Sequence, residues 1–141
     1  MKKIILVAVA VICAYATSFA TSKTPIAAIV AFNKKFPNAT NVKWGKENAH
    51  NYEAAFKLNG ITYSANFSDS GEWLETESPI TFNQLPEKVQ QAFNLVHKGA
   101  KVKAAAQIET SKQGTIYEVE ITKGIKTVEF FYNANGSETK E

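Results

Sequence analysis

Two histidines and a short run of acids are the side chains in this sequence with the clearest chemical potential. The only histidines are His50 and His97, and four acids, Asp69, Glu72, Glu75 and Glu77, lie within nine residues. A histidine held beside carboxylates suits general acid–base catalysis or a metal ion. Two carboxylates that flank one bond suit glycoside hydrolysis.

The places of the two histidines favour structural roles. His50 lies in an expected turn at 48–51. His97 lies in the last turn of an expected helix, where the helix dipole favours a cation. We expect both side chains to be exposed to solvent and to take no part in a site.

The acids also have a structural explanation. The stretch from Asp69 to Gly71 has the chemistry of an Asx turn and lacks the ligand spacing of an EF-hand, with a calcium loop as the alternative. Glu75 and Glu77 alternate onto one face of an expected exposed strand, where acids form a solvated surface. We therefore expect no catalytic site, no metal site, no cofactor and no enzymatic activity.

Trp44 and Trp73 are the largest side chains, and two roles are open to them. Exposed aromatic residues often anchor binding interfaces. Each Trp also lies near the end of an expected strand, where it would cover the core, and we expect this second role. An exposed pair would instead form, with the acids from Asp69 to Glu77, a small-ligand or metal-binding site.

Residues 1–20 have the layout of a secretory signal peptide: two lysines, an apolar run and small residues. The apolar run is shorter than the roughly 20 residues of a membrane-spanning helix, which is the alternative. We expect cleavage after Ala20, or else after Ala16, and no membrane anchor afterwards. The single cysteine, Cys13, lies inside this leader and follows Ile12, a poor neighbour for lipid attachment. The remaining chain would have no disulfide.

The composition is that of an ordinary globular domain. The chain has 141 residues, of which 45% are hydrophobic and 21% are charged. It contains no arginine, the residue that reads phosphates and guanine edges in a bidentate manner. Without the two leader lysines the chain is also close to neutral, so nucleic-acid binding is excluded.

One phrase occurs twice in the sequence. Residues 52–60 read YEAAFKLNG and residues 117–124 read YEVEITKG, so Tyr52 and Tyr117 are 65 residues apart. The glycines at 71 and 136 keep the same offset. Helical spacing of apolar residues precedes each copy, beginning at Pro25 and at Pro86. Each copy therefore belongs to a unit that begins with a helix.

Period-two alternation after each helix predicts four strands with one buried face. In the first unit we expect a tight hairpin at Asn59-Gly60. In the second unit we expect the hairpin at Lys123-Gly124, with a connection that is one residue shorter than in the first unit. Its first strand is expected to point Val102, Ala104, Ala106 and Ile108 inward, and Lys103, Ala105 and Gln107 outward.

The predicted fold is α+β, with two tandem helix-plus-four-stranded antiparallel meander units forming a two-layer α/β sandwich. The units are expected at 21–78 and 79–141, joined into one compact body with a single interior. A lone unit of this size would have too small a core to be stable without disulfides.

Several segments together resemble the PepSY-like family of exported Bacteroidetes proteins, also described as beta-lactamase-inhibitor-like. They are FPNATNVKW (36–44), NYEAAFKLNG (51–60), DSGEWLETE (69–77), LPEKV (85–89) and IYEVEI (116–121). The resemblance implies a layout similar to the beta-lactamase inhibitory protein and a periplasmic or secreted location. It implies no cofactor and no enzymatic activity, and it suggests inhibition of a peptidase or another hydrolase.

The outward face of the central strands is the expected binding surface. Its mixture of charged and small residues suits a protein or peptide partner better than an apolar ligand, with a solvated face that binds nothing as the alternative. The candidate binding residues are Glu53, Lys57, Glu118, Glu120, Phe131, Trp44 and Trp73. We expect an exported, non-catalytic protein that binds an envelope protein or peptide. The sequence leaves the oligomeric state open.

Overall fold

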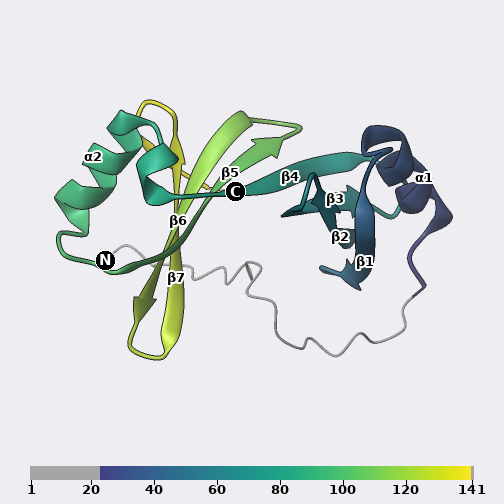
Figure 1. Ribbon diagram of the computed structural model, residues 1–141, viewed down its shortest axis with the longest axis horizontal. Coiled ribbons are helices and arrows are strands. Elements are labelled where there is room, and N and C mark those ends of the chain that lie inside the picture. Colours follow the sequence, from purple (N-terminus) through teal and green to yellow (C-terminus); the bar gives the residue numbers. More distant parts are fainter. Residues whose placement is uncertain (1–22, 141) are drawn as a thin grey trace.

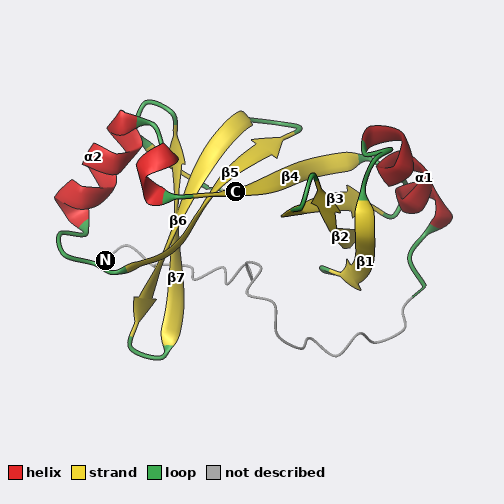
Figure 2. Ribbon diagram, viewed as in Figure 1, coloured by secondary structure: helices red, strands yellow, loops and turns green. Residues whose placement is uncertain are grey.

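The computed structural model describes residues 23–140, in which a helix followed by four strands occurs twice (Figures 1 and 2). The elements are α1 (Ile26–Lys35), β1 (Thr40–Lys46), β2 (Asn51–Leu58), β3 (Ile61–Ser68), β4 (Trp73–Ile80), the 3₁₀ turn η1 (Phe82–Gln84), α2 (Glu87–Val96), β5 (Val102–Thr110), β6 (Gly114–Lys123), β7 (Lys126–Asn133) and β8 (Glu138–Thr139). The expected leader, its cleavage after Ala20 or Ala16, and Cys13 lie outside the described residues. Within residues 23–140, no helix has the length and apolar character needed to cross a membrane.

All eight strands form one antiparallel sheet in the order β1-β2-β3-β4-β5-β6-β7-β8. Every strand therefore pairs with its neighbours in sequence, and the predicted α+β class with antiparallel strands is confirmed. The sheet has two halves, β1 to β4 and β5 to β8. They are joined where β4 pairs with β5, from Glu75↔Thr110 to Ile80↔Ala105. Figure 1 shows α1 and α2 toward opposite ends of the long axis, with β4 and β5 between them.

The hairpins β2–β3 and β6–β7 have the same register, 65 residues apart. Tyr52 pairs with Phe67 in the first hairpin, and Tyr117 pairs with Tyr132 in the second. The expected hairpin at Lys123-Gly124 is wrong, because Lys123 pairs with Lys126 and the turn residues are 124 and 125. The second hairpin is thus no shorter than the first.

The helix-bearing face of the sheet holds two apolar clusters. The cluster under α1 contains Ala28, Phe32, Ala54, Phe56, Ala65 and Phe67. The cluster under α2 contains Leu85, Val89, Phe93, Ala105, Val119, Ile121 and Tyr132. The expectation of a single interior is therefore wrong. On this face the side chains of β4 and β5 between the clusters are polar, namely Thr76, Ser78, Gln107 and Glu109.

Aromatic rings dominate the cluster under α1. Phe32 is buried, and its ring lies 5.0 Å from Phe56, 5.4 Å from Trp44 and 6.0 Å from Phe67 between centroids. These are edge-to-face arrangements, which the ring quadrupoles favour. Burial of one such side chain stabilises the fold by about 2–3 kcal/mol before the entropy of ordering it is counted. Trp44 is thus part of the packing under α1.

A β-bulge in β5 overturns the predicted orientation of that strand. Its register against β6 shifts between Val102 and Ala104. A one-residue shift moves every following side chain to the other face of a sheet. Ala105, expected outward, is buried under α2, whereas Ala106 and Ile108, expected inward, lie on the opposite face in a third cluster with Ile116.

Candidate functional site

The face of the sheet opposite both helices is continuous across the two halves, and we call it the helix-free face. Directly paired residues in antiparallel strands share a face. One row of such pairs runs Glu53, Asn66, Glu75 and Thr110, and the next runs Ala55, Ser64, Glu77, Ile108 and Ile116. The third row runs Pro79, Ala106, Glu118 and Phe131. Strands β2 to β7 thus contribute to one surface.

Carboxyl groups are concentrated on this face, and Glu77 is at their centre. Burial, and after it the carboxylates of Glu53, Glu75, Glu120 and Glu129, raise the pKa of Glu77 to about 7. The expectation that Glu75 and Glu77 lie on an exposed strand is wrong, because β4 pairs with strands on both sides. Both residues are only partly exposed.

The carboxyl groups of Glu118, Glu120 and Glu129 each have an oxygen within 4.8 Å of the others. Glu118 and Glu120, which are among the predicted binding residues, are 1% exposed, so both are buried on this face. The Nζ of Lys103 lies 2.9 Å from Glu120 Oε2 and donates to Thr127 Oγ1 at 3.1 Å. Carboxylates at this spacing suit a hard divalent cation. Lys103, however, already supplies positive charge beside Glu120.

The predicted binding residues divide between the two faces. Glu53, Lys57, Glu118, Glu120 and Phe131 lie on the helix-free face, and Phe131 packs against the cluster of Ala106, Ile108 and Ile116. Trp44 and Trp73 do not join them, because both pack against the cluster under α1.

Trp73 is held on the α1 side by two polar contacts. Its Nε1 donates to Thr76 Oγ1 at 2.9 Å, and Lys35 Nζ lies 3.8 Å from the centroid of its ring. The predicted role of Trp44 and Trp73 in covering the core agrees with these positions. A ligand site that joins both Trp to the acids of β4 does not form, because Glu75 and Glu77 point to the other face.

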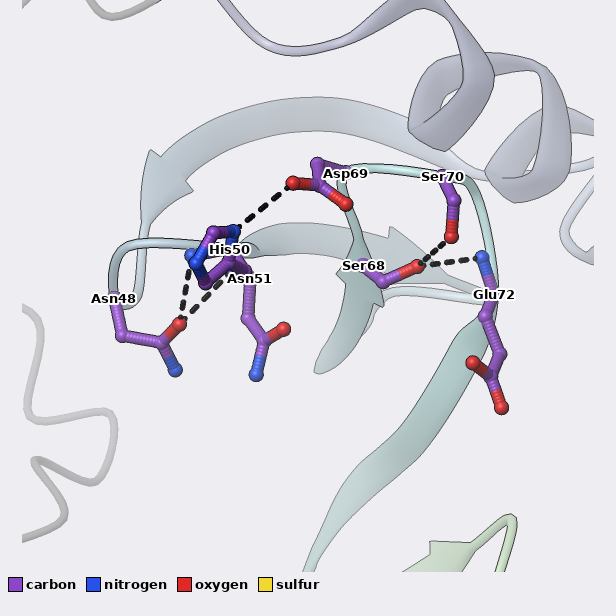
Figure 3. Close-up of polar contacts among 7 residues, drawn as sticks. All are labelled: Asn48, His50, Asn51, Ser68, Asp69, Ser70 and Glu72. Carbon is purple, nitrogen blue, oxygen red and sulfur yellow. Dashed lines mark hydrogen bonds and ion pairs between the residues drawn. The ribbon is translucent and has the colours of Figure 1, made fainter.

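The histidine nearest to an acid is His50, in the turn before β2 (Figure 3). Its Nδ1 lies 3.1 Å from Asp69 Oδ2, and both side chains are largely exposed. A catalytic triad would require a hydroxyl bonded to this histidine. The nearby hydroxyls of Ser68 and Ser70 bond to each other at 2.8 Å instead, and Ser68 Oγ also accepts from the Glu72 N–H (Figure 3). The predicted turn at Asp69 is present.

His97 lies at the end of α2, among aromatic side chains. Its ring is in contact with Phe130, with centroids 3.9 Å apart, and with Phe93, with centroids 5.0 Å apart. The residue is partly buried, so the expectation of an exposed side chain is wrong here. His50 and His97 are not brought together.

A polar pocket lies at one end of the helix-free face, with a cavity volume of about 360 Å³. Its walls come from the β1–β2 turn, the end of β3, the start of β4 and the β5–β6 turn. The lining residues are Glu47, Asn48, Asn51, Asn66, Leu74, Glu75, Thr110, Ser111, Lys112 and Gln113. The β5–β6 turn is held against β4 by a hydrogen bond, in which the Ser111 N–H donates to the Leu74 carbonyl at 2.7 Å.

Sequence reasoning did not find this pocket. Among its lining residues, Asn66 occupies an outward position of an alternating strand, so the alternation contained a signal for this residue. Glu47 and Gln113 lie in or next to turns, where no periodicity places a side chain. They meet because β4 and β5 pair.

Comparisons with known proteins support the fold. A BLIP-like protein from Bacteroides fragilis has a crystal structure that is similar with a TM-score of 0.67 at 26% identity, over 81% of this chain and 82% of that chain. The crystal structure from Bacteroides eggerthii described as "putative periplasmic proteins" is similar with a TM-score of 0.74 at 19% identity, over 83% of this chain and 86% of that chain. No curated protein matches the chain.

The family resemblance expected from the sequence is confirmed. The family model described as "Putative beta-lactamase-inhibitor-like, PepSY-like" matches residues 50–138. These residues run from the turn before β2 to the beginning of β8, and so include most of the helix-free face. The chain belongs to the PepSY-like family.

Proposed function

We propose that this chain is a non-catalytic binding protein of the bacterial cell envelope, which holds a protein partner against its helix-free face. The family's description as beta-lactamase-inhibitor-like supports a hydrolase or peptidase as that partner. The relative described as periplasmic, together with the expected leader, supports a periplasmic or secreted location.

The observation that carries this proposal is the continuity of the helix-free face. Rows of paired side chains cross from β2 to β7 without interruption, so both halves contribute to one surface. A surface that spans several strands suits a protein partner, because specific protein interfaces need about 800 Å² on each side.

We further infer that residues 21–78 and 79–141 are two tandem units that share this task. The equal register of the two hairpins and the separate apolar cluster under each helix support this division. In each unit the helix packs on one face of its own strands. On the other face Ala106, Ile108, Ile116, Glu118 and Glu120 are buried, and partly exposed residues such as Glu53, Glu75, Glu77 and Phe131 remain to contact a partner.

The side-chain chemistry argues against a catalytic role. Covalent catalysis needs a nucleophile within hydrogen-bond reach of a base. Among residues 23–140, the hydrogen bonds of His50 are with Asp69 and with its own turn, and the hydroxyls of Ser68 and Ser70 bond to each other.

A capture experiment with matched charge reversals tests the proposal. Immobilised protein would be exposed to an envelope extract, and bound proteins would be identified by mass spectrometry. Glu53→Lys reverses a charge on the helix-free face, and Glu109→Lys makes the same change on an exposed residue of the other face. A partner captured by the parent protein and by Glu109→Lys, but lost with Glu53→Lys, supports binding through this face.

The captured partner is then purified, and its hydrolytic rate is measured against added protein. A stoichiometric fall in rate supports an inhibitor. Capture that is equal for all three proteins would place the contact elsewhere and contradict the proposal.

The alternative of a small-ligand or metal-binding protein is tested in parallel. Thermal unfolding is followed with calcium, magnesium and a metabolite panel, using Glu129→Gln as the variant of the three-carboxylate cluster. A rise of several degrees with a metal, abolished by Glu129→Gln and accompanied by no specific capture, would replace the proposed function by this alternative.

A further inference from the structure

The polar pocket at the end of the helix-free face lies where the two halves meet. Glu75 and Thr110, which are paired across β4 and β5, both line it. The β1–β2 turn of the first half and the β5–β6 turn of the second half form its walls. A partner lying across the helix-free face would therefore meet this pocket at the boundary between the halves.

The lining contains an amide oxygen, that of Asn66, whose hydrogen-bonding capacity is unsatisfied. Asn66 Nδ2 donates to Glu75 Oε1 at 2.7 Å, which fixes the orientation of the amide, because a carboxylate accepts only. Asn66 Oδ1 is enclosed and receives no hydrogen bond from the described residues. An enclosed acceptor without a donor costs stability, so this wall of the pocket is short of hydrogen-bond donors.

The charges of the pocket favour a cation. Glu47 is exposed as a residue, but partial burial of its carboxyl, and after it the carboxylate of Glu75, raise its pKa. Burial, and after it the carboxylates of Glu47 and Glu75, raise the pKa of Glu53, which lies in the same row as Asn66 and Glu75. A positive group among these three carboxyls would relieve their mutual repulsion. Lys112 is the one cation of the lining and is exposed.

The spacing of the acceptors favours an organic cation over a metal ion. A bound metal needs several oxygens converging on one point. Within residues 23–140, the acids that converge in this manner are Glu118, Glu120 and Glu129, and none of them lines the pocket. An ammonium group has three donors and a guanidinium group has five, and they can reach acceptors on different walls.

We propose that this pocket receives a lysine or arginine side chain of the protein partner. The proposal rests on the proposed function, because it names the chemistry by which a partner on the helix-free face is recognised. Leu74, the aliphatic residue of the lining, would contact the methylene stem, as the stems of long basic side chains commonly lie along apolar surface.

Peptide titrations followed by NMR test the proposal without the natural partner. The probes are Ac-Gly-Gly-Arg-Gly-Gly-NH₂, its lysine analogue and its citrulline analogue, which keeps the shape of arginine without the charge. We expect the arginine and lysine probes to shift the amide signals of residues 47–51, 66 and 110–113. The citrulline probe should bind at least tenfold more weakly, and binding should weaken between 50 mM and 500 mM salt.

Two variants at the pocket and one matched control locate the binding. Glu47→Gln and Glu75→Gln each remove one pocket charge and should raise the dissociation constant for the arginine probe at least fivefold. Glu109→Gln removes a charge from the other face and should leave it unchanged. The amide fingerprint of each variant shows whether it is folded. If Glu75→Gln does not fold, Glu47→Gln alone tests the proposal, because Glu47 is an exposed turn residue.

Equal binding of the citrulline probe, signal changes outside the pocket, or no signal change at all would overturn the proposal. The failure of this proposal is distinguishable from failure of the proposed function. If a captured partner is lost with Glu53→Lys but retained by Glu47→Gln and Glu75→Gln, the helix-free face binds and the pocket does not select a cation.

Discussion

Gly71 lies directly against the first turn of α1, because a Cβ atom added to this glycine would be 2.7 Å from the carbonyl oxygen of Ala27. Gly136, 65 residues later, meets α2 in the same manner, 2.5 Å from the carbonyl oxygen of Lys88. Both glycines have positive φ, 86° and 85°. In each half, the turn after the third strand therefore touches the helix through a residue that has no side chain.

Substitution of these glycines should be more costly than substitution of a turn glycine in open space. Gly60 also has positive φ, 83°, but nothing lies near its added Cβ. We expect Gly60→Ala to lower the free energy of unfolding by about 1 kcal/mol, the cost of the left-handed conformation. Gly71→Ala and Gly136→Ala should lose a further ~1–3 kcal/mol from the steric conflict with the helix. Urea denaturation measures all three, and equal losses at the three positions would argue against the helix contact.

Stability should fall as the pH rises through neutrality, because of Glu77. Its folded-state pKa, about 7, is above the ordinary value of 4.5, so the folded chain retains a proton that the unfolded chain releases. This contribution is fully present below pH 4.5 and is lost as the pH rises through 7. The full loss is on the order of 3 kcal/mol.

Urea denaturation at pH 5 and pH 8 of the parent protein and of Glu77→Gln checks this prediction. Between pH 5 and pH 8, Glu77→Gln should lose less unfolding free energy than the parent protein. The raised pKa values of Glu47 and Glu53 should account for part of the loss that remains. The exposed Glu109→Gln is the control and should behave as the parent protein does. An unchanged pH dependence in Glu77→Gln would show that this carboxyl is not the source.

The two halves should unfold together although their apolar clusters are separate. Trp44 and Trp73 both pack under α1, so tryptophan fluorescence reports on the first half. Phe93→Ala removes a buried ring under α2 and should cost about 3–5 kcal/mol. Because β4 and β5 are paired over six residues, we expect the fluorescence and circular dichroism midpoints to fall together. Leu95→Ala, at an exposed position of α2, should leave both nearly unchanged. A fluorescence midpoint that stays in place would mean that the halves unfold independently.

The contact between Lys35 and Trp73 should be measurable as a small stabilisation. A lysine this close to the face of a tryptophan ring contributes about 0.5–1 kcal/mol through cation–π attraction. Lys35→Gln should lose about this amount in urea denaturation. Lys34→Gln removes the neighbouring basic residue of the same last turn of α1 and controls for the helix dipole. Equal losses in both variants would assign the effect to the dipole.

The helices and the first hairpin were predictable from the sequence, because both depend on local patterns. Pro25 and Pro86 stand directly before α1 and α2. The alternation from Tyr52 onward places β2 and β3 with the correct face buried, and Asn59, with φ of 50°, turns between them as its preference for this conformation predicts.

The orientation of β5 and the pocket could not be obtained in this manner. The alanines from 104 to 106 are small enough for either face, so the alternation gives no sign of the bulge that reverses them. The burial of Glu77 depends on β5, which pairs with β4 only after α2 has been crossed. The outward carboxyl groups of Glu75 and Glu77 were therefore expected to be solvated. In the structure β5 lies beside them and covers one side.

The strictly sequential strand order has a consequence for how the chain reaches its native state. Nearly all strand pairs join residues fewer than about 20 positions apart, as do Asn51↔Ser68 and Ile116↔Asn133, and local pairing of this kind speeds folding. The β4–β5 ladder is the exception, since Glu75 meets Thr110 across a whole helix. Its loop-closure entropy is the largest among the strand pairs, so each meander should collapse onto its own helix first. The joining of the two halves, which completes the polar pocket, is then the late event of folding.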